Sequence, residues 1–385
     1  MPWPAHVEWR EGAFALTADF RVRIAGHDDA RLRAGIGRAL DRLEKRTVLD
    51  FGPRYAATGG ALVITCATAG STLPQLGDDE SYTLSVRADG AELRAPNVVG
   101  ALRGLETFLQ LFEARSDAAQ ASRLPAFAAP CVAIRDAPRF PWRGLMIDVV
   151  RHFQPTEVLH RNLDAMAAVK LNVLHLHLTD DQGFRIESKR HPELHAVSAE
   201  SGVLTQEQIK TLVAAAAERG IRVVPEFDVP GHATAWLASH PEIASMPGRY
   251  AVAKDWGILD PTMDPTKPET HALLESFFGE MAALFPDEFF HIGGDENNGK
   301  HWNASARIRE FKYGHGFRTS EELHAWLNQK LAAMLAQHGK RLVGWDEVLH
   351  RDLPRSAVVH SWRGPESLAQ AVQQGFAGIL SAGYY

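Results

Sequence analysis

The chain has 385 residues, a net charge of −6 from 41 basic and 47 acidic residues, and a hydrophobic content of 45%, which is an ordinary balance for a globular protein. No basic stripe indicates nucleic-acid binding, and no run of about 18 apolar residues indicates a membrane span. Residues 1–4 lack the basic and apolar regions of a signal peptide. The protein is therefore expected in the cytoplasm, or in the periplasm or outside the cell if a signal peptide is missing from this sequence.

Residues 1–136 are expected to form a small α+β domain, because short runs of alternating apolar residues are mixed with two stretches of helical periodicity. Asp89-Gly90 is a typical hairpin turn, and the alanine-rich stretch Ala118–Ala129 is interpreted as a linker or covering loop. The expected strands are Phe20–Ile24, Ala61–Cys66, Tyr82–Val86 and Glu92–Ala95, and the expected helices are Asp28–Lys45 and Asn97–Phe112.

Residues 137–385 alternate between strand and helix patterns, which predicts parallel βα units and a (β/α)₈ TIM barrel. Only seven strands are found before the sequence stops, so the barrel is expected to be incomplete at its C-terminal end. The expected strands are Gly144–Val149, Leu171–Leu178, Ile221–Phe227, Glu288–Ile292, Arg341–Trp345, Ala357–Ser361 and Ala377–Ser381. The expected helices are Thr156–Val169, Thr205–Arg219, Pro268–Phe285, Ser320–His338 and Glu366–Gln374.

Polar and aromatic residues follow one predicted strand after another, at the carboxyl ends where such barrels carry their active sites. The segments in question are Arg151-His-Phe153, His175-Leu-His-Leu-Thr-Asp-Asp181, Glu226-Phe-Asp-Val-Pro-Gly-His232, His291-Ile-Gly-Gly-Asp-Glu296, Gly344-Trp-Asp-Glu347 and Ser361-Trp-Arg363. Charges that served only stability would be spread over both ends of the barrel. This pattern therefore predicts a functional site at one end.

Carboxylates combined with tryptophans favour a sugar substrate, because an indole covers the C–H face of a pyranose and carboxylates bind hydroxyls or transfer protons. Most glycosidases use two carboxyl groups on opposite sides of the scissile bond. Asp295 and Glu296 are neighbours in the sequence, so they can converge only where the strand bends, and then from the same side. One of them could protonate the leaving oxygen while the other orients a nucleophile that the substrate carries, such as a 2-acetamido group.

The chain resembles glycoside hydrolase family 20, the β-N-acetylhexosaminidases, over nearly all of residues 138–385. The first 136 residues resemble the small domain that precedes the barrel in that family, with weaker motifs. The matching segments, in the family's order, are Arg143-Gly-Leu-Met-Ile-Asp148, Arg151-His-Phe153, Lys170-Leu-Asn-Val-Leu-His-Leu-His-Leu-Thr-Asp-Asp181, Pro225-Glu-Phe-Asp-Val-Pro-Gly-His232, His291-Ile-Gly-Gly-Asp-Glu296 and Gly344-Trp345.

The resemblance implies a retaining exo-β-N-acetylhexosaminidase that removes terminal GlcNAc or GalNAc through an oxazolinium intermediate, with no cofactor and no metal. Its partner would be a carbohydrate, not a nucleic acid or a membrane. Glu296 would be the general acid and then the base, and Asp295 would orient the acetamido group and stabilise the oxazolinium ion.

The resemblance also implies substrate-binding residues. Arg151 would bind O3 and O4 of the sugar, and Tyr385 would donate to the acetamide oxygen. Trp345 and Trp362 would wall the pocket. The remaining expected site residues are Asp180 and His232, which would hold the pKa of Glu296 near the working pH, and His177 on the pocket floor.

The sequence departs from the family in two places. Val150 replaces the usual small hydroxyl residue before Arg151, and the family's last strand, with a further tryptophan and acid, is absent. The 385 residues are therefore expected to be a fragment of a longer chain that is poorly soluble or nearly inactive alone, since the first and seventh strands would lack their shared partner.

Three other functions can be compared with the hexosaminidase at this stage. A metal-dependent amidohydrolase would use His175, His177, His232 and Asp295, since His-x-His at a strand end also suits metal binding. A sugar-binding protein without activity would be expected to lack one of the two acids, and both are present. A chitinase-like endo-enzyme would carry alternating acids along one strand, which the sequence does not show.

Overall fold

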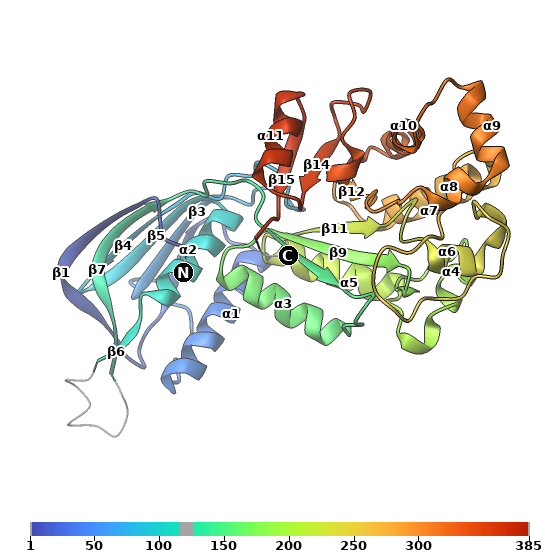
Figure 1. The fold of residues 1–385 in the computed structure, drawn as a ribbon. Helices are drawn as coiled ribbons and strands as arrows, with labels where there is room; N and C mark the ends of the chain where they lie inside the picture. Colours follow the sequence, from blue (N-terminus) through green and yellow to red (C-terminus); the bar gives the residue numbers. More distant parts are fainter. Residues whose placement is uncertain (1, 116–125, 384–385) are drawn as a thin grey trace. The chain divides into compact units, whose positions relative to one another are not determined.

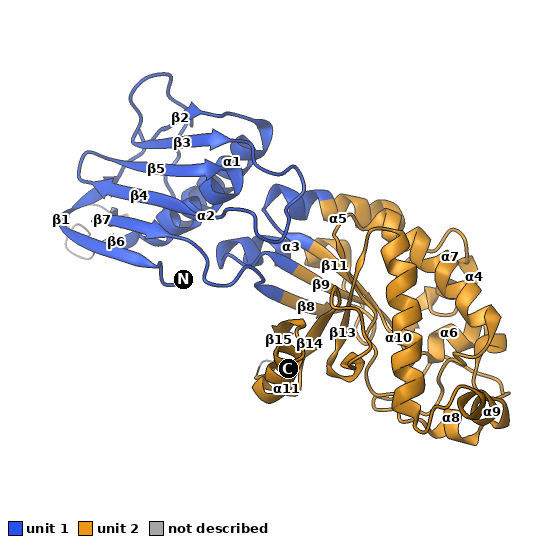
Figure 2. Ribbon diagram, turned by 90° about the horizontal axis from the view of Figure 1, so that it is seen from above, with its two compact units in different colours: residues 1–144, 160–173, 214–222 blue, residues 145–159, 174–213, 223–385 orange. Residues whose placement is uncertain are grey.

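The computed structural model describes residues 2–115 and 126–383. By packing, the chain divides into two compact units (Figure 2). Unit 1 comprises residues 1–144, 160–173 and 214–222, and unit 2 comprises residues 145–159, 174–213 and 223–385.

Unit 1 is built on a mixed sheet whose strands run in the order β1-β7-β4-β5-β3-β2, with β6 paired to β7. β3 runs parallel to its neighbours β2 and β5, whereas β4 is antiparallel to β5 and β7. The strands are β1 (His6–Leu16), β2 (Val22–Gly26), β3 (Leu62–Thr68), β4 (Tyr82–Arg87), β5 (Gly90–Asn97), β6 (Glu113–Arg115) and β7 (Ala126–Asp136).

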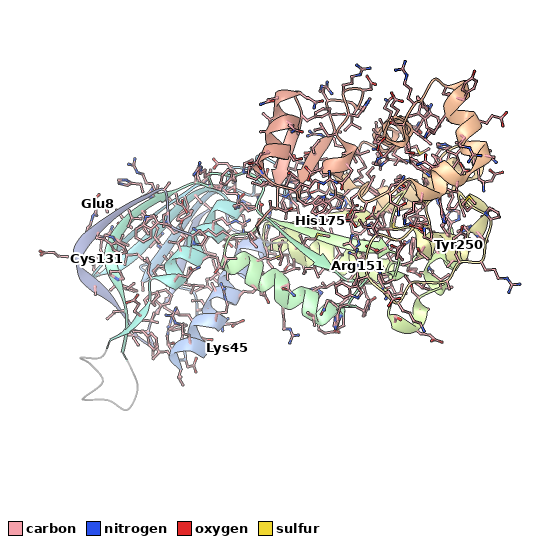
Figure 3. The ribbon with its side chains drawn as sticks, in the orientation of Figure 1. Glu8, Lys45, Cys131, Arg151, His175 and Tyr250 are labelled. Carbon is pink, nitrogen blue, oxygen red and sulfur yellow. The ribbon has the colours of Figure 1, made fainter. Side chains whose placement is uncertain are left out.

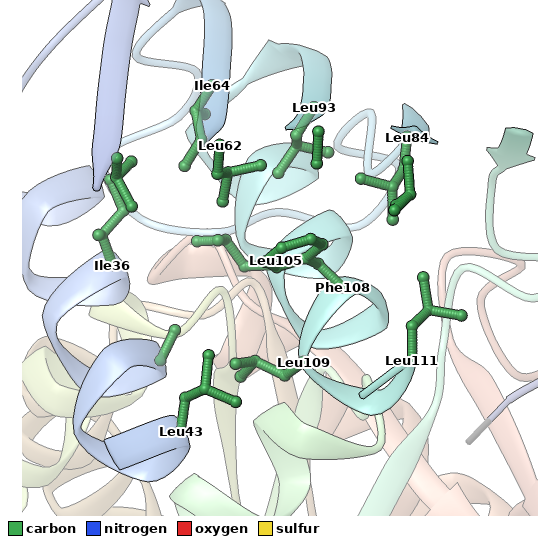
Figure 4. Packing of buried hydrophobic residues seen from close by; sticks show 14 of the residues in the cluster. Ile36, Leu43, Leu62, Ile64, Leu84, Leu93, Leu105, Phe108, Leu109 and Leu111 are labelled. Carbon is green, nitrogen blue, oxygen red and sulfur yellow. The ribbon is translucent and has the colours of Figure 1, made fainter. Parts of the chain in front are cut away.

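Two helices, α1 (Ala30–Thr47) and α2 (Val98–Gln110), lie together on one face of this sheet (Figure 1). Each begins where a side chain accepts a backbone N–H of the first turn: Asp29 accepts from Leu32, and Asn97 from Gly100. Between the helices and the sheet lies a continuous hydrophobic core (Figure 4). Among its members are Ile36, Leu43, Leu62, Ile64, Leu84, Leu93, Leu105 and Phe108.

Two expectations for this region need correction. Residues 126–129 were expected to continue a linker, but they belong to β7, which pairs with β1, β4 and β6. β1 was not predicted, because its residues are mostly exposed and do not alternate cleanly. Both strands depend on pairing with distant segments, and local propensity does not report such pairing. Residues 118–125 of the expected linker lie outside the described residues.

The second sheet runs in the order β10-β9-β11-β12-β13-β14-β15, with β8 paired to β9. From β11 to β15 every neighbouring pair is parallel. The strands are β8 (Gly144–Asp148), β9 (Val173–Asp180), β10 (Gly183–Phe184), β11 (Arg222–Phe227), β12 (Phe289–His291), β13 (Arg341–Trp345), β14 (Val358–Ser361) and β15 (Ala377–Leu380).

A helix lies between most consecutive strands of this sheet, which is the βα alternation that the sequence predicts. The long helices are α3 (Thr156–Ala168), α5 (Gln206–Glu218), α7 (Pro268–Leu284), α10 (Ser320–Gln337) and α11 (Pro365–Gln373). Shorter helices that the sequence did not predict are α4 (Pro192–Ala196), η1 (Ala199–Ser201), α6 (Thr234–Ser239), η2 (Pro241–Ile243), α8 (Lys300–Ala304), α9 (Ala306–Gly314) and η3 (Asp346–Val348).

The structure confirms the α/β class and the seven expected strands of the curled, open sheet. Every residue of β9 and β11 is buried, as expected for strands that are covered on both faces. Among the described residues, β8 pairs only with β9, and β15 pairs only with β14. No described helix is long and apolar enough to cross a membrane.

The domain boundary at 136/137 stays a proposal. It falls between β7 and β8, the last strand of one sheet and the first of the next. Packing, however, assigns residues 160–173 and 214–222 to unit 1, so the compact units do not follow a single cut in the sequence.

Candidate active site

A cavity of about 400 Å³ lies in unit 2 at the carboxyl ends of the strands, within the size range of small-ligand sites. Seven of the nine residues expected at the site line it, namely Arg151, His177, His232, Asp295, Glu296, Trp345 and Trp362. Asp180 is fully buried and does not line the cavity, and Tyr385 lies outside the described residues. In Figure 3, His175 is labelled part-way along the strands and Arg151 further toward their carboxyl ends.

A sharp bend after β12 brings Asp295 and Glu296 to the same cavity. Gly293, Gly294 and Glu296 all have positive φ angles, of 64°, 87° and 49°. A Cβ on Gly293 would lie 1.9 Å from a carboxylate oxygen of Asp228, so only glycine fits there. Side chains that would point to opposite faces of a continuous strand therefore converge, as the sequence analysis required.

His232 connects the two acids to a buried carboxylate pair. Its Nε2 lies 3.2 Å from Oε2 of Glu296 and 3.7 Å from Oδ2 of Asp295. Its Nδ1 lies 3.2 Å from Oδ1 of Asp180 and 3.2 Å from Oδ2 of Asp181. Burial lowers the pKa of His232, but these hydrogen bonds to carboxylates outweigh it and raise the pKa above its usual value. His232 is therefore a buried cation that faces both acids.

Arg151 is held in place by two carboxylates from neighbouring strand ends. Its Nη1 donates to Oδ2 of Asp148 at 2.8 Å, and its Nη2 lies 2.6 Å from Oδ2 of Asp180. Asp148 also accepts the backbone N–H of Val150 and of Arg151, which fixes the turn after β8. Because both carboxylates are themselves anchored, the guanidinium has a defined position in the cavity wall.

Beneath the cavity, Glu226 is a fully buried carboxylate. Nε1 of Trp345 donates to its Oε1 at 2.8 Å, and the nearest ring nitrogens of His175 and His177 lie 2.8 and 2.9 Å from its Oε2. Nε2 of His177 is hydrogen-bonded to Asp180 at 2.8 Å. His177 thus joins the floor of the cavity to the carboxylate that holds Arg151 and His232, and Glu226 fixes the edge of the Trp345 indole.

Trp362 forms another part of the wall, with a carboxylate of its own. Its Nε1 donates to Oε2 of Glu347 at 3.3 Å, and its backbone N–H donates to Asp346 at 2.9 Å. Arg363 donates to Glu347 at 2.7 Å. Burial raises the pKa of Glu347, which Arg363 partly opposes. Glu347 therefore positions an indole and places a carboxylate near Asp295.

The two adjacent acids have opposite proton affinities. The hydrogen bond with His232 lowers the pKa of Glu296 below its usual range. Burial raises the pKa of Asp295 to about 7, and the carboxylates of Glu226 and Glu347 add to the increase. Burial and the carboxylate of Asp295 likewise raise the pKa of Asp228. Asp295 and Asp228 therefore hold a proton more tightly than Glu296 does, whereas the pKa of Glu296 was expected near the working pH.

Three groups of side chains at the site have ligand atoms within 4.8 Å of one another, the distance a metal would require. The first group is His175, His291 and His360 below the cavity, and the second is Asp228, His232 and Asp295. The third, Asp180, Asp181 and His232, shares His232 with the second. The set expected for an amidohydrolase is thus divided, because His175 belongs to the first group and His232 and Asp295 to the second.

Several lining residues had no assigned role in the sequence analysis. They are Met146, Asp148, His152, Glu226, Asp228, Trp256 and Gly257. Glu226 and Asp228 could have been found, because both stand at a predicted strand end with an i, i+2 spacing. Trp256 could not, because it lies in a long connection between β11 and α7 that carries no periodic pattern.

Fold and site together define an α/β protein whose parallel strands present an acid-rich, tryptophan-lined cavity at their carboxyl ends. The chain belongs to glycosyl hydrolase family 20. The model of the family's catalytic domain matches residues 140–385, and a model described as "beta-acetyl hexosaminidase like" matches residues 1–111.

Three similar proteins illustrate this membership. A beta-hexosaminidase of Porphyromonas gingivalis is 36% identical over 335 residues, which are 85% of this chain and 42% of that protein. The structure of Flavobacterium johnsoniae chitobiase is 45% identical with a TM-score of 0.93, covering 100% of this chain and 59% of that one. An exo beta-N-acetylglucosaminidase of Vibrio harveyi, solved in complex with N-acetylglucosamine, is 27% identical with a TM-score of 0.82, over 99% and 60%. The chain spans about half the length of these relatives.

Proposed function

We propose that the chain carries the catalytic site of a retaining exo-β-N-acetylhexosaminidase, which hydrolyses terminal β-linked GlcNAc or GalNAc with assistance from the substrate's own acetamido group. The observation that carries the proposal is the convergence of Asp295 and Glu296 on one wall of the cavity, both within 3.7 Å of His232. Family membership and the named relatives support the same activity.

Glu296 is proposed as the general acid and then the general base. Its carboxylate is partly exposed at the cavity, where the oxygen of the leaving group can reach it. After the glycosidic bond breaks, the same group accepts a proton from the water that opens the intermediate. Microscopic reversibility requires one residue for both steps.

Asp295 is proposed to bind the acetamido N–H and to stabilise the oxazolinium ion. It stands on the same wall as Glu296, so it is poorly placed to attack the anomeric carbon from the opposite side. The acetamido oxygen can attack from that side instead. A buried carboxylate beside the resulting cation supplies electrostatic stabilisation that water would otherwise weaken.

The reaction needs Glu296 protonated and Asp295 charged, which is the reverse of the order of their pKa values. Substrate binding favours the exchange. An acetamido N–H that donates to Asp295 stabilises its charged form, and a sugar that covers Glu296 removes water from that carboxylate and raises its pKa. Binding of the correct substrate is thereby coupled to the catalytic protonation state.

Recognition of the terminal sugar is assigned to the residues around these acids. Arg151 would donate to O3 and O4, and Trp345 and Trp362 would pack against the sugar and its acetamido methyl group. Asp180, His177 and Glu226 act from below by holding Arg151, His232 and Trp345. Tyr385 is proposed, from the family motif alone, to donate to the acetamide oxygen.

Arg151 also gives the proposed exo specificity. A sugar extended at O4 would collide with the guanidinium that binds this hydroxyl, so cleavage should release one sugar at a time from the non-reducing end. A long chitin oligomer should yield N-acetylglucosamine as the first product by chromatography. Early release of internal fragments would contradict an exo enzyme.

The deciding experiment is hydrolysis of p-nitrophenyl N-acetyl-β-glucosaminide, with p-nitrophenyl β-glucoside as the matched control. The chain should be compared with a version lengthened at its C-terminus by about 100 residues, since the barrel family typically needs about 250 residues plus insertions. We expect the lengthened version to hydrolyse the acetamido substrate, unaffected by a chelator, and to hydrolyse almost none of the glucoside. Equal turnover of both, loss of activity with chelator, or no turnover by either version would overturn the proposal.

A further inference from the structure

The connection between β11 and α7 presents an exposed tryptophan at the mouth of the active-site cavity. Trp256 lines the same cavity as Asp295 and Glu296, yet its side chain is 80% exposed. The next residue, Gly257, also lines the cavity and has a φ of 130°, so the backbone turns sharply beside the indole. Isolated exposed apolar residues are common, and the position of this one is what calls for an explanation.

The segment that carries Trp256 is closed at its base. The backbone N–H of Ser245 donates to the carbonyl of Thr262 at 3.0 Å, next to an isolated bridge between Ala244 and Met263. Nε1 of the buried Trp302 donates to the carbonyl of Met263 at 2.8 Å, which fixes that base to the core. Residues 245–262 therefore form a loop whose two ends are held together and fixed to the core.

The loop is also anchored on both sides of Trp256. On one side, Ala253 donates its N–H to the carbonyl of Asp181 at 2.8 Å, and Gln182 donates to the carbonyl of Asp255 at 2.8 Å. On the other side, the carboxylate of Asp260 accepts from Asn298 and Lys300, each at 2.8 Å. Asp181 and Gln182 follow the end of β9, and Asn298 and Lys300 follow Glu296. The hydrogen bonds thus hold Trp256 between the segment after β9 and the segment after Glu296.

We propose that Trp256 is the platform of an aglycone subsite, which binds the C–H face of a pyranose linked to the terminal sugar. The inference rests on the proposed function. The leaving oxygen must lie beside Glu296, so the ring that carries it must extend toward the loop anchored just after Glu296. An exposed indole held at that place matches a sugar ring, because its flat apolar face covers pyranose C–H groups. The natural substrate is then a β-linked oligosaccharide and not a glycoside of a small alcohol.

The test compares Trp256→Ala and Trp256→Phe on two substrates that need the same proton transfer: the β-1,4-linked disaccharide of N-acetylglucosamine, and methyl N-acetyl-β-glucosaminide, whose aglycone is too small to stack. Aryl glycosides are avoided because their rings can stack as well. We expect Trp256→Ala to lower the ratio of kcat/KM, disaccharide over methyl glycoside, about tenfold, mainly through KM. Trp256→Phe should retain most of the ratio.

Tyr313→Ala is the matched control, because this aromatic residue on α9 is 89% exposed and does not line the cavity. It should leave the ratio unchanged. An unchanged ratio in Trp256→Ala, or an equal loss on both substrates, would overturn the subsite. All variants are therefore made in the lengthened version as well, and failure of both unsubstituted versions on both substrates would instead contradict the proposed function itself.

Discussion

One carboxylate of unit 1 and two carboxylates of unit 2 have pKa values shifted in opposite directions. In unit 1, Glu80 receives hydrogen bonds from Arg103 and Arg143, each at 2.6 Å. Burial alone would raise the pKa of Glu80, but the two guanidinium groups outweigh it and lower the pKa. In unit 2, Asp228 and Asp295 are buried beside each other, and the pKa of each is raised. Opposite charges stabilise the first arrangement, whereas like charges strain the second.

This difference separates a structural cluster from a functional one. A carboxylate between two arginines holds its charge over a wide pH range and has no proton to exchange near neutrality. A carboxylate with a pKa of about 7 changes its charge when a ligand arrives. Carboxylates with a raised pKa lower the stability of the folded state, so they are found only where the surrounding structure holds them in place. In unit 2 a sharp bend of the backbone does so.

The largest effect should come from Glu296→Gln. Loss of a positioned general acid lowers kcat by about two to four powers of ten. The loss should shrink for 2,4-dinitrophenolate, a leaving group that needs no proton, so kcat should be measured for a series of aryl glycosides. Equal losses over the whole series would exclude Glu296 from the acid role.

Glu80→Gln should destabilise the protein strongly, because it leaves the buried Arg103 and the half-buried Arg143 without their shared anion. Breaking such a buried pair costs about 3–5 kcal/mol in the free energy of unfolding, measurable by denaturant titration. The depressed pKa means that this stabilisation is present above the usual carboxyl range and is lost as pH falls through it. Glu8→Gln is the control, since its exposed pair with Arg10 should contribute less than about 1 kcal/mol.

Asp295→Asn should stabilise the folded protein, in contrast to Glu80→Gln, while it lowers the activity. It should lower kcat by about two to three powers of ten, since an amide cannot balance the oxazolinium charge. It should also raise Tm at pH 8. The folded pKa of about 7 lies above the usual 3.8, so the folded state binds the proton more tightly and its stability falls as pH rises from about 4 to 7. A Tm advantage at pH 4 that is as large as at pH 8 would contradict this origin.

The parallel sheet and its polar edge could be predicted because their signals are local. Strands such as β11 contain short apolar runs between helical patterns, here Val223-Val224, and the residues after them form compact motifs. β1 and β7 could not, since their pairing is a long-range event without a strong local pattern. The strand-end position of Glu226 was a local signal, but its partners were not: Trp345 reaches it from β13, and His175 and His177 from β9.

The order of the pKa values at the site also could not be predicted from the sequence. Adjacent acids in a motif give no reason to expect that one pKa is lowered and the other raised. The difference arises because His232 hydrogen-bonds Glu296, whereas Asp295 is buried near Glu226 and Glu347. Sequence identifies the members of such a group, and only their packing sets the order in which they titrate.

The smallest expected effect concerns Glu347, and it tests this account of Asp295. The proposed mechanism needs a proton on this pair of acids, so kcat/KM should fall on the alkaline side as Asp295 loses its proton, near pH 7. Glu347→Gln removes a nearby carboxylate that raises the pKa of Asp295, so the alkaline limb should move to lower pH by less than about one unit. Glu366→Gln, the same change at an exposed position on α11, should leave the limb in place. A lower plateau with an unmoved limb would show that Glu347 acts only by holding Trp362, and that the raised pKa of Asp295 has its origin in burial and Glu226 alone.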